Sequence, residues 1–131
     1  MRLKHLLIAL VASATPAVGH AQLRGDPVAG KAVYDAICAT CHSLMPPAKL
    51  APPMAMVARH YHEAFANDAE GVEALVRFIS APDTLRMTMP KHVIARFGVM
   101  PRFALSEKQV RDVSRYVWSL SATEAPAPHG R

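Results

Sequence analysis

The chain has 131 residues and a formal net charge of +5 at pH 7, with 51% hydrophobic and 19% charged residues. This length suits one compact domain and is too short for two domains of ordinary size. The basic residues form no cluster that alternates with aromatic side chains, so no nucleic acid is expected as a partner.

The first 21 residues have the pattern of a cleaved signal peptide. Arg2 and Lys4 precede an apolar run over residues 6–18, and Gly19 and Ala21 supply small residues before a predicted cut after residue 21. The run is shorter than the roughly 20 residues of a membrane-spanning helix, so no stable membrane span is expected, although retention of the segment as an anchor stays open. We expect export to the periplasm and a mature chain of 110 residues whose net charge falls to +3 because Arg2 and Lys4 are removed.

The first helix of the mature chain is expected from about Pro27, after an Asp26 N-cap, and runs into the only two cysteines. These cysteines, Cys38 and Cys41, are followed directly by His42. Cys-x-x-Cys-His is the attachment motif of haem c, because residues three apart lie on one face of a helical turn and both sulfurs can bond to one porphyrin edge. We therefore predict one covalent haem c, with the imidazole of His42 as the proximal iron ligand.

We weighed three other roles for the two cysteines, and the first two each lack a feature that they require. A structural zinc site needs four ligands, but there is no second Cys-x-x-Cys, and His60 and His62 lie on opposite sides of a helix. A thioredoxin-like redox pair should follow a strand, and no strand pattern precedes Cys38. A plain disulfide stays open as the alternative in an exported protein.

Four helical segments are predicted after this motif. Residues 43–53 (SLMPPAKLAPP) contain four prolines and form a loop. A helix is expected over residues 54–66, and a second begins at residue 68 and stops before Pro82, with apolar side chains at helical spacing. A short helical turn is expected over residues 92–97.

The last helix has the clearest signals. Ser106 with Gln109 resembles a capping box, and four apolar residues follow at spacings of 3, 4 and 3: Val110, Val113, Val117 and Leu120. No hairpin signal occurs, so the fold class is all-α. We expect a single domain over residues 22–121 and a disordered tail over residues 122–131.

From residue 26 to residue 120 the chain resembles the class I c-type cytochromes, most closely the small bacterial mono-haem proteins. In that family a first helix with a Gly-x-x-x-aromatic pair crosses a C-terminal helix that carries a tyrosine. Gly30 and Tyr34 match the first pattern, and Val113 and Tyr116 match the second. The resemblance implies a class I cytochrome c-like bundle of about four to five helices wrapped around one covalently bound haem.

The resemblance also implies residues around the iron. The family's Gly-Pro-x-Leu element corresponds to residues 51–54 (APPM), which makes the carbonyl of Pro52 the acceptor for the His42 Nδ1 proton. Apolar burial of the ring is expected from Phe97 and Tyr116. Further haem-packing positions are Ile37, Val99, Phe103 and Val117.

The family's sixth ligand is a methionine, commonly in Met-Pro, in the loop before the C-terminal helix. Both Met89 and Met100 precede a proline. Met100 lies six residues before Ser106 and ends the run from Phe97 to Pro101, so it is the predicted distal iron ligand, with Met89 as the alternative.

Methionine and histidine ligation suits an electron carrier rather than an enzyme, because it keeps the iron six-coordinate in both oxidation states. The expected partners are redox proteins, either a membrane-bound reductase or oxidase or a periplasmic dehydrogenase. Basic loop residues should border the haem crevice: Lys49, Lys91, Arg96 and Arg102. Two alternatives stay open: a dedicated haem subunit of a periplasmic dehydrogenase, and an open-site haem protein for gas sensing or peroxide chemistry.

Overall fold

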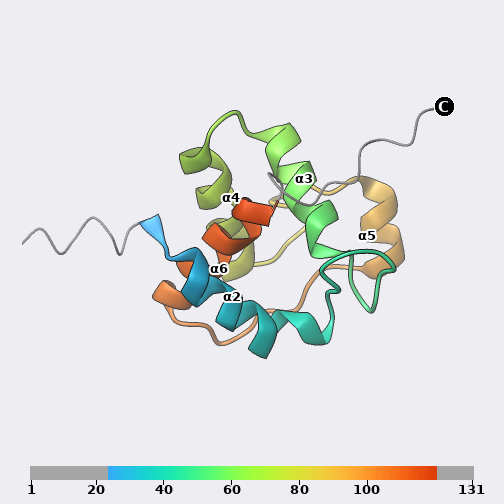
Figure 1. The fold of residues 1–131 in the computed structure, drawn as a ribbon. Coiled ribbons are helices and arrows are strands. Elements are labelled where there is room, and N and C mark those ends of the chain that lie inside the picture. The colour runs from blue at the N-terminus through green and yellow to red at the C-terminus, as the bar shows by residue number, and fades with distance from the viewer. Residues whose placement is uncertain (1–23, 121–131) are drawn as a thin grey trace, which may run out of the picture.

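The computed structural model describes residues 24–120. Its helices, in chain order, are α2 (Pro27–Ala36), the 3₁₀ turn η1 (Cys38–Thr40), α3 (Met54–Ala64), α4 (Asp68–Ser80), α5 (Lys91–Phe97) and α6 (Glu107–Ser119) (Figure 1). No strand occurs in this range, which confirms the all-α prediction. The expected signal segment and C-terminal tail lie outside the described residues. No helix among residues 24–120 is long and apolar enough to cross a bilayer.

Two helix ends differ from the prediction. The first helix does not continue into the cysteine motif, because the backbone at Ile37 leaves the α region (φ −124°, ψ −57°) and the motif forms a 3₁₀ turn. Helix α3, which was predicted over residues 54–66, ends at Ala64 because Phe65 adopts an extended conformation (φ −128°, ψ 129°). Each difference arises from the backbone conformation of one residue, Ile37 or Phe65, and the spacing of apolar residues does not predict that conformation.

The helix starts follow the capping residues in the sequence. The carboxylate of Asp26 accepts a hydrogen bond from the Val28 N–H (2.8 Å), and the Asn67 amide oxygen accepts one from the Glu70 N–H (3.0 Å). At α6 both bonds of the predicted capping box between Ser106 and Gln109 form. Each cap satisfies N–H groups that a helix start leaves without an intrahelical partner.

Helix α6 crosses α2 closely at a glycine (Figure 1). A Cβ atom on Gly30 would lie 2.0 Å from the carbonyl oxygen of Asp112, so only glycine fits at this crossing. One turn further along, the rings of Tyr34 and Tyr116 pack with centroids 5.5 Å apart. This is the helix pair that the resemblance implied.

Helix α4 packs on the other side of α6 through a second glycine. A Cβ atom on Gly71 would lie 1.8 Å from the ring of Trp118. The Trp118 indole N–H donates to Asp68 Oδ1 (2.8 Å), and the His62 ring stacks on the indole with centroids 3.6 Å apart. Helices α2, α3 and α4 all contact α6, which therefore forms the centre of the core. Helix α5 makes no close backbone contact with another of the described helices.

Candidate haem-binding site

An open apolar pocket collects most of the predicted site residues. Its lining includes both cysteines, His42, both candidate methionines and Phe97. The other expected haem-packing residues that line it are Ile37, Val99, Phe103 and Val117. Apart from sulfur atoms, the polar side-chain atoms of the described lining come only from His42 and Tyr61. The pocket therefore suits an apolar ligand, and two thiols lie on its wall.

Cys38 and Cys41 are free, half-buried thiols on the wall of this pocket. They belong to η1, where the N–H groups of Cys41 and His42 both donate to the Cys38 carbonyl (3.1 and 2.9 Å). Burial raises the pKa of the Cys38 thiol, and a backbone hydrogen bond opposes this shift. The disulfide that the sequence left open is not formed in the structure.

The His42 imidazole is held by one short hydrogen bond, with 2.7 Å between Nδ1 and the carbonyl oxygen of Pro52. Because a carbonyl only accepts, Nδ1 carries the proton and Nε2 keeps its lone pair. Burial lowers the pKa of His42, and the bond to Pro52 partly opposes this shift. The neutral imidazole is the form that binds a metal ion, so Nε2 is prepared for that role.

The loop between the motif and α3 places Pro52. The Ala51 N–H donates to the Cys41 carbonyl (3.1 Å), and the Met54 N–H donates to the Ser43 carbonyl (2.8 Å). These bonds tie the start of α3 to the residues that follow the cysteines. The Tyr34 hydroxyl adds a bond to the His42 carbonyl (3.0 Å), which links the same loop to α2.

Both methionines of the Met-Pro pairs line the pocket, one on each side of α5 in the chain. Met89 is buried, with 8% of its surface exposed, whereas Met100 is half-buried. Gly98 ends α5 with φ at +73°, a conformation that favours glycine and lets the chain turn before Met100. Since both sulfurs belong to the same pocket, the choice of Met100 over Met89 stays a prediction.

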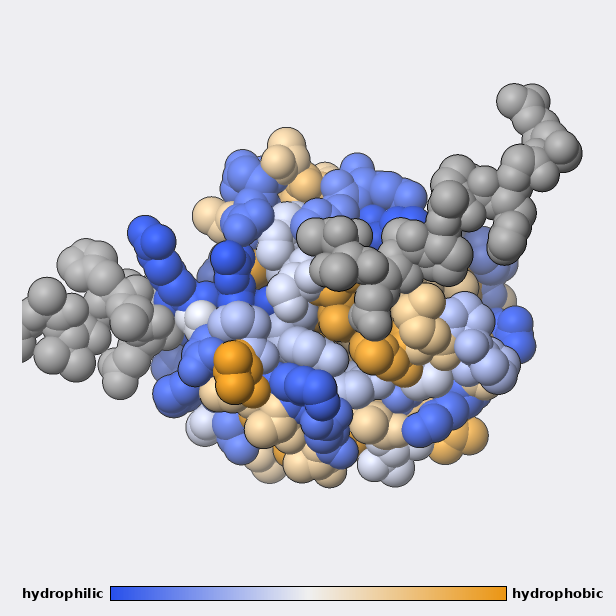
Figure 2. Space-filling model, in the orientation of Figure 1, coloured by the Kyte–Doolittle hydropathy of each residue, from blue (hydrophilic) through white to orange (hydrophobic). Residues whose placement is uncertain are grey.

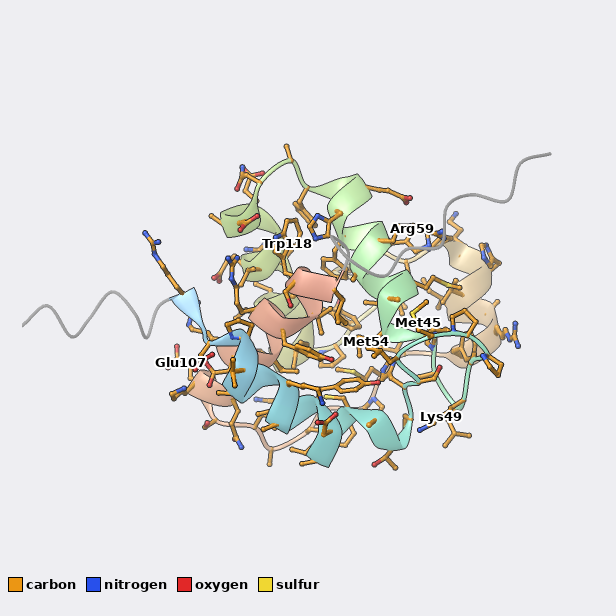
Figure 3. The ribbon with its side chains drawn as sticks, in the orientation of Figure 1. Met45, Lys49, Met54, Arg59, Glu107 and Trp118 are labelled. Atoms are coloured by element: carbon orange, nitrogen blue, oxygen red, sulfur yellow. The ribbon has the colours of Figure 1, made fainter. Side chains whose placement is uncertain are left out.

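Tyr116 lies outside the described pocket lining, and its ring packs against Tyr34 instead. Sequence reasoning also missed part of the wall, mainly on α3 and α4: Met54, Val57, Tyr61, Leu75, Phe78 and Ile79. Their helical spacing was visible, but spacing alone does not separate a face that packs on protein from one that packs on a ligand. Figure 3 shows Met54 pointing toward the interior.

The basic residues expected near the crevice are all exposed: Lys49, Lys91, Arg96 and Arg102. Lys49 Nζ donates to the Ala39 carbonyl (2.7 Å), and the Arg96 guanidinium lies over the Phe97 ring at 4.9 Å. The first contact places a positive charge beside Ala39, which lies between the two cysteines. The second places one beside Phe97, which lines the pocket. Lys49 projects outward in Figure 3.

Apolar side chains of the pocket wall also reach the surface. Leu50, Val99 and Phe103 are 74%, 39% and 41% exposed, although all three line the pocket. Figure 2 shows that apolar areas lie among hydrophilic residues on one face of the molecule. The pocket therefore opens to solvent at an apolar edge.

Comparison with characterised protein sequences and with solved structures gives no match. The family described as Cytochrome c matches residues 27–121, which is well over half of the chain. The matched segment includes the cysteine motif, the α2–α6 crossing and the whole pocket lining. The chain therefore belongs to the cytochrome c family.

Proposed function

We propose that this protein is a periplasmic carrier of single electrons, with His42 and Met100 as the axial ligands of its haem iron. Membership of the cytochrome c family implies one covalently bound haem c and a haem-based role in electron transfer. The periplasmic location, the axial ligands and the domain limits (22–121, after a cleaved signal peptide) are the proposed details.

The residues of the pocket fit this group. The observation that carries the proposal is the Nδ1 proton of His42 held by the Pro52 carbonyl, in a pocket that His42 shares with two free thiols. Cys38 and Cys41 would hold the porphyrin edge as thioethers, and Nε2 of His42 would hold the iron. When bound, the haem supplies a one-electron ferric/ferrous couple.

The axial ligands and the apolar wall of the pocket set the reduction potential of that couple. A thioether ligand prefers ferrous iron, so Met100 raises the reduction potential relative to a second histidine. The apolar lining acts in the same direction, because a low dielectric disfavours the extra charge of the ferric centre. Phe97 and the other apolar wall residues also exclude water from the site.

The exposed edge of the pocket is the proposed exit for the electron. Leu50, Val99 and Phe103 reach the surface there. Exposed basic residues, such as Lys49 and Arg102, steer the carrier toward acidic surfaces of a reductase, oxidase or dehydrogenase.

The test is an optical spectrum of the oxidised holoprotein and of two variants. The wild type should show the weak far-red band of a sulfur–iron bond, and Met100→Ala should lose it. Met89→Ala is the matched control and should keep the band, while the pyridine haemochrome spectrum shows that haem remains attached in all three proteins.

Two results contradict the proposal. Loss of the band in Met89→Ala alone assigns the sixth ligand to Met89 instead. A wild-type protein that is high spin and binds carbon monoxide rapidly when reduced has an open iron site, and the carrier function is then wrong.

A further inference from the structure

The main-chain carbonyl of His42 accepts a hydrogen bond from a side chain that precedes the cysteine motif. The donor is the hydroxyl of Tyr34 on α2, which lies 3.0 Å away and eight residues earlier in the chain. No backbone N–H among residues 24–120 donates to this carbonyl. The Tyr34 bond therefore connects the main chain of His42 directly to α2.

This connection matters because α2 does not continue into the motif. The backbone leaves the helical region at Ile37, so the helix itself no longer sets the position of His42. Within residues 24–120, the other hydrogen bonds to carbonyls of the motif come from the motif itself or from the loop over residues 43–53. The Tyr34 hydroxyl therefore restores a fixed relation between α2 and the motif beyond the break.

Tyr34 is itself held firmly by the core. It is 4% exposed, and its ring packs against Tyr116 on α6 with centroids 5.5 Å apart. One turn earlier, α2 crosses α6 closely at Gly30 (Figure 1). Burial raises the pKa of Tyr34, and Tyr116 and Cys38 act in the same direction, so the phenol keeps the proton that it donates. A rigid donor from the core thus reaches the main chain of His42.

Two hydrogen bonds from different elements hold His42. The Pro52 carbonyl accepts the Nδ1 proton of the ring at 2.7 Å, and the Tyr34 hydroxyl donates to the main-chain carbonyl at 3.0 Å. Pro52 precedes α3, whereas Tyr34 belongs to α2. With its ring and its main chain both fixed, the imidazole has little freedom to turn.

We propose that the Tyr34 hydroxyl positions the proximal imidazole, because it fixes the main chain of His42 and thereby the plane of the ring. This assignment rests on the proposed ligation of the iron by His42. Tyr34 lies outside the described pocket lining, so it acts through His42 and not by contact with the haem. Loss of the hydroxyl should turn the imidazole plane.

Proton NMR of the oxidised holoprotein with bound cyanide tests this assignment. Cyanide replaces the sixth ligand and is symmetric about the iron–carbon axis, so the imidazole plane alone sets the pattern of paramagnetic shifts of the four haem methyl groups. A rotation of that plane moves two opposite methyl signals upfield and the other two downfield. Tyr34→Phe removes the hydroxyl but keeps the ring, and it should move the signals in this opposed manner.

Ser119→Ala is the matched control for loss of a hydroxyl. The Ser119 hydroxyl also donates to a main-chain carbonyl, that of Tyr116 (2.6 Å), and Ser119 lies outside the described pocket lining. The methyl signals of this variant should stay at their wild-type positions. If Tyr34→Phe does not fold, 3-fluorotyrosine placed at position 34 is a stronger donor of nearly the same shape, and it should also produce opposed movements.

The outcomes separate this assignment from the proposed function. Methyl signals that stay at the wild-type positions in Tyr34→Phe, or that all move in one direction, overturn the positioning role. Thermal unfolding of the same samples identifies a purely structural effect, which lowers stability and leaves the methyl signals unchanged. Haem attachment and the far-red sulfur–iron band are measured without cyanide, and their absence in the wild type contradicts the proposed function instead.

Discussion

The hydrogen bond between His42 and Pro52 shows how one contact can prepare the imidazole that we propose as an iron ligand. A carbonyl acceptor at 2.7 Å keeps the proton on Nδ1, so the other nitrogen is available without a change of tautomer. The same bond holds the ring in one orientation and increases its basicity as a ligand. The cysteines alone do not provide this, because their proposed role is to hold the porphyrin edge.

The two cysteines should contribute separately to haem attachment. Cys38→Ala and Cys41→Ala each leave one thioether and one unreacted vinyl group, whose conjugation with the ring shifts the pyridine haemochrome band to longer wavelength. The double variant should release its haem into acidified acetone. Thr40→Ala, an exposed position between them, is the control and should behave as the wild type. An unshifted band in both single variants would contradict thioether bonding.

Among the elements, α2 and α6 depend on a backbone approach that only glycine permits. The Cβ position of Gly30 is 2.0 Å from the Asp112 carbonyl oxygen, and Asp112 also accepts a hydrogen bond from the Asp26 N–H (2.8 Å). The start of α2 is therefore tied to α6 at two neighbouring points. A shift of α2 at Gly30 would disturb both contacts.

Gly30→Ala should lower the free energy of unfolding by about 1–3 kcal/mol through overpacking. The loss should appear although alanine favours helix formation by about 1 kcal/mol over glycine. Denaturant unfolding of the holoprotein, followed by circular dichroism, measures the change. Ala32→Gly, at an exposed position of α2, isolates the helix-propensity effect. A Gly30→Ala protein as stable as the wild type would show that the crossing tolerates a methyl group.

Asp68, at the start of α4, should make the free energy of unfolding depend on pH in the acid range. Asp68 accepts hydrogen bonds from Trp118 Nε1 (2.8 Å) and Arg115 (2.9 Å), and these hold its pKa below the usual 3.8. A folded-state pKa that is depressed stabilises the fold above the unfolded value, and the stabilisation is lost as pH falls through the folded value. Asp68→Asn should therefore be less stable than the wild type at pH 7, and the difference should shrink below pH 3.8.

Thermal unfolding from pH 7 to pH 2 measures this dependence. Glu70→Gln, which changes an exposed acid in the same helical turn, is the control for the helix dipole. An equal pH dependence in Asp68→Asn and the wild type would show that the bonds to Trp118 and Arg115 do not stabilise the charged form.

The whole molecule divides into a core around α6 and a more weakly supported wall of the pocket. Helices α2, α3 and α4 pack on α6, whereas α5 has no close backbone contact with the other described helices. Val93 of α5 is nonetheless buried, and it lines the pocket. The packing of α5 therefore depends largely on what fills the pocket.

Haem-free protein should lose order first at α5. In hydrogen exchange of the full chain produced without haem attachment, residues 87–103 should lose more protection than α2 and α6, because few contacts hold this region without the ligand. The holoprotein is the reference. Equal loss of protection in α5 and α6 would mean that the apoprotein unfolds as one unit, and unchanged protection in α5 would mean that the haem does not support it.

Local sequence signals accounted for the Cys-x-x-Cys-His motif, the helix caps at Asp26 and Ser106, and the all-α class. Cys38, Cys41 and His42 lie within five consecutive residues, and each cap contacts backbone no more than three residues away. Such contacts form within one turn of chain, so residue type and spacing are enough to predict them.

The tertiary structure decided which apolar faces line the pocket. It set Tyr61 and Phe78 at the pocket and placed Tyr116 against Tyr34. These contacts join segments up to 82 residues apart, and helical periodicity marks a face as apolar without saying what covers it. The sequence by itself therefore predicted the cysteine motif and the helix class, because these depend on local residue type and spacing, whereas only the placement of α3, α4 and α5 decided which of their faces shape the cavity.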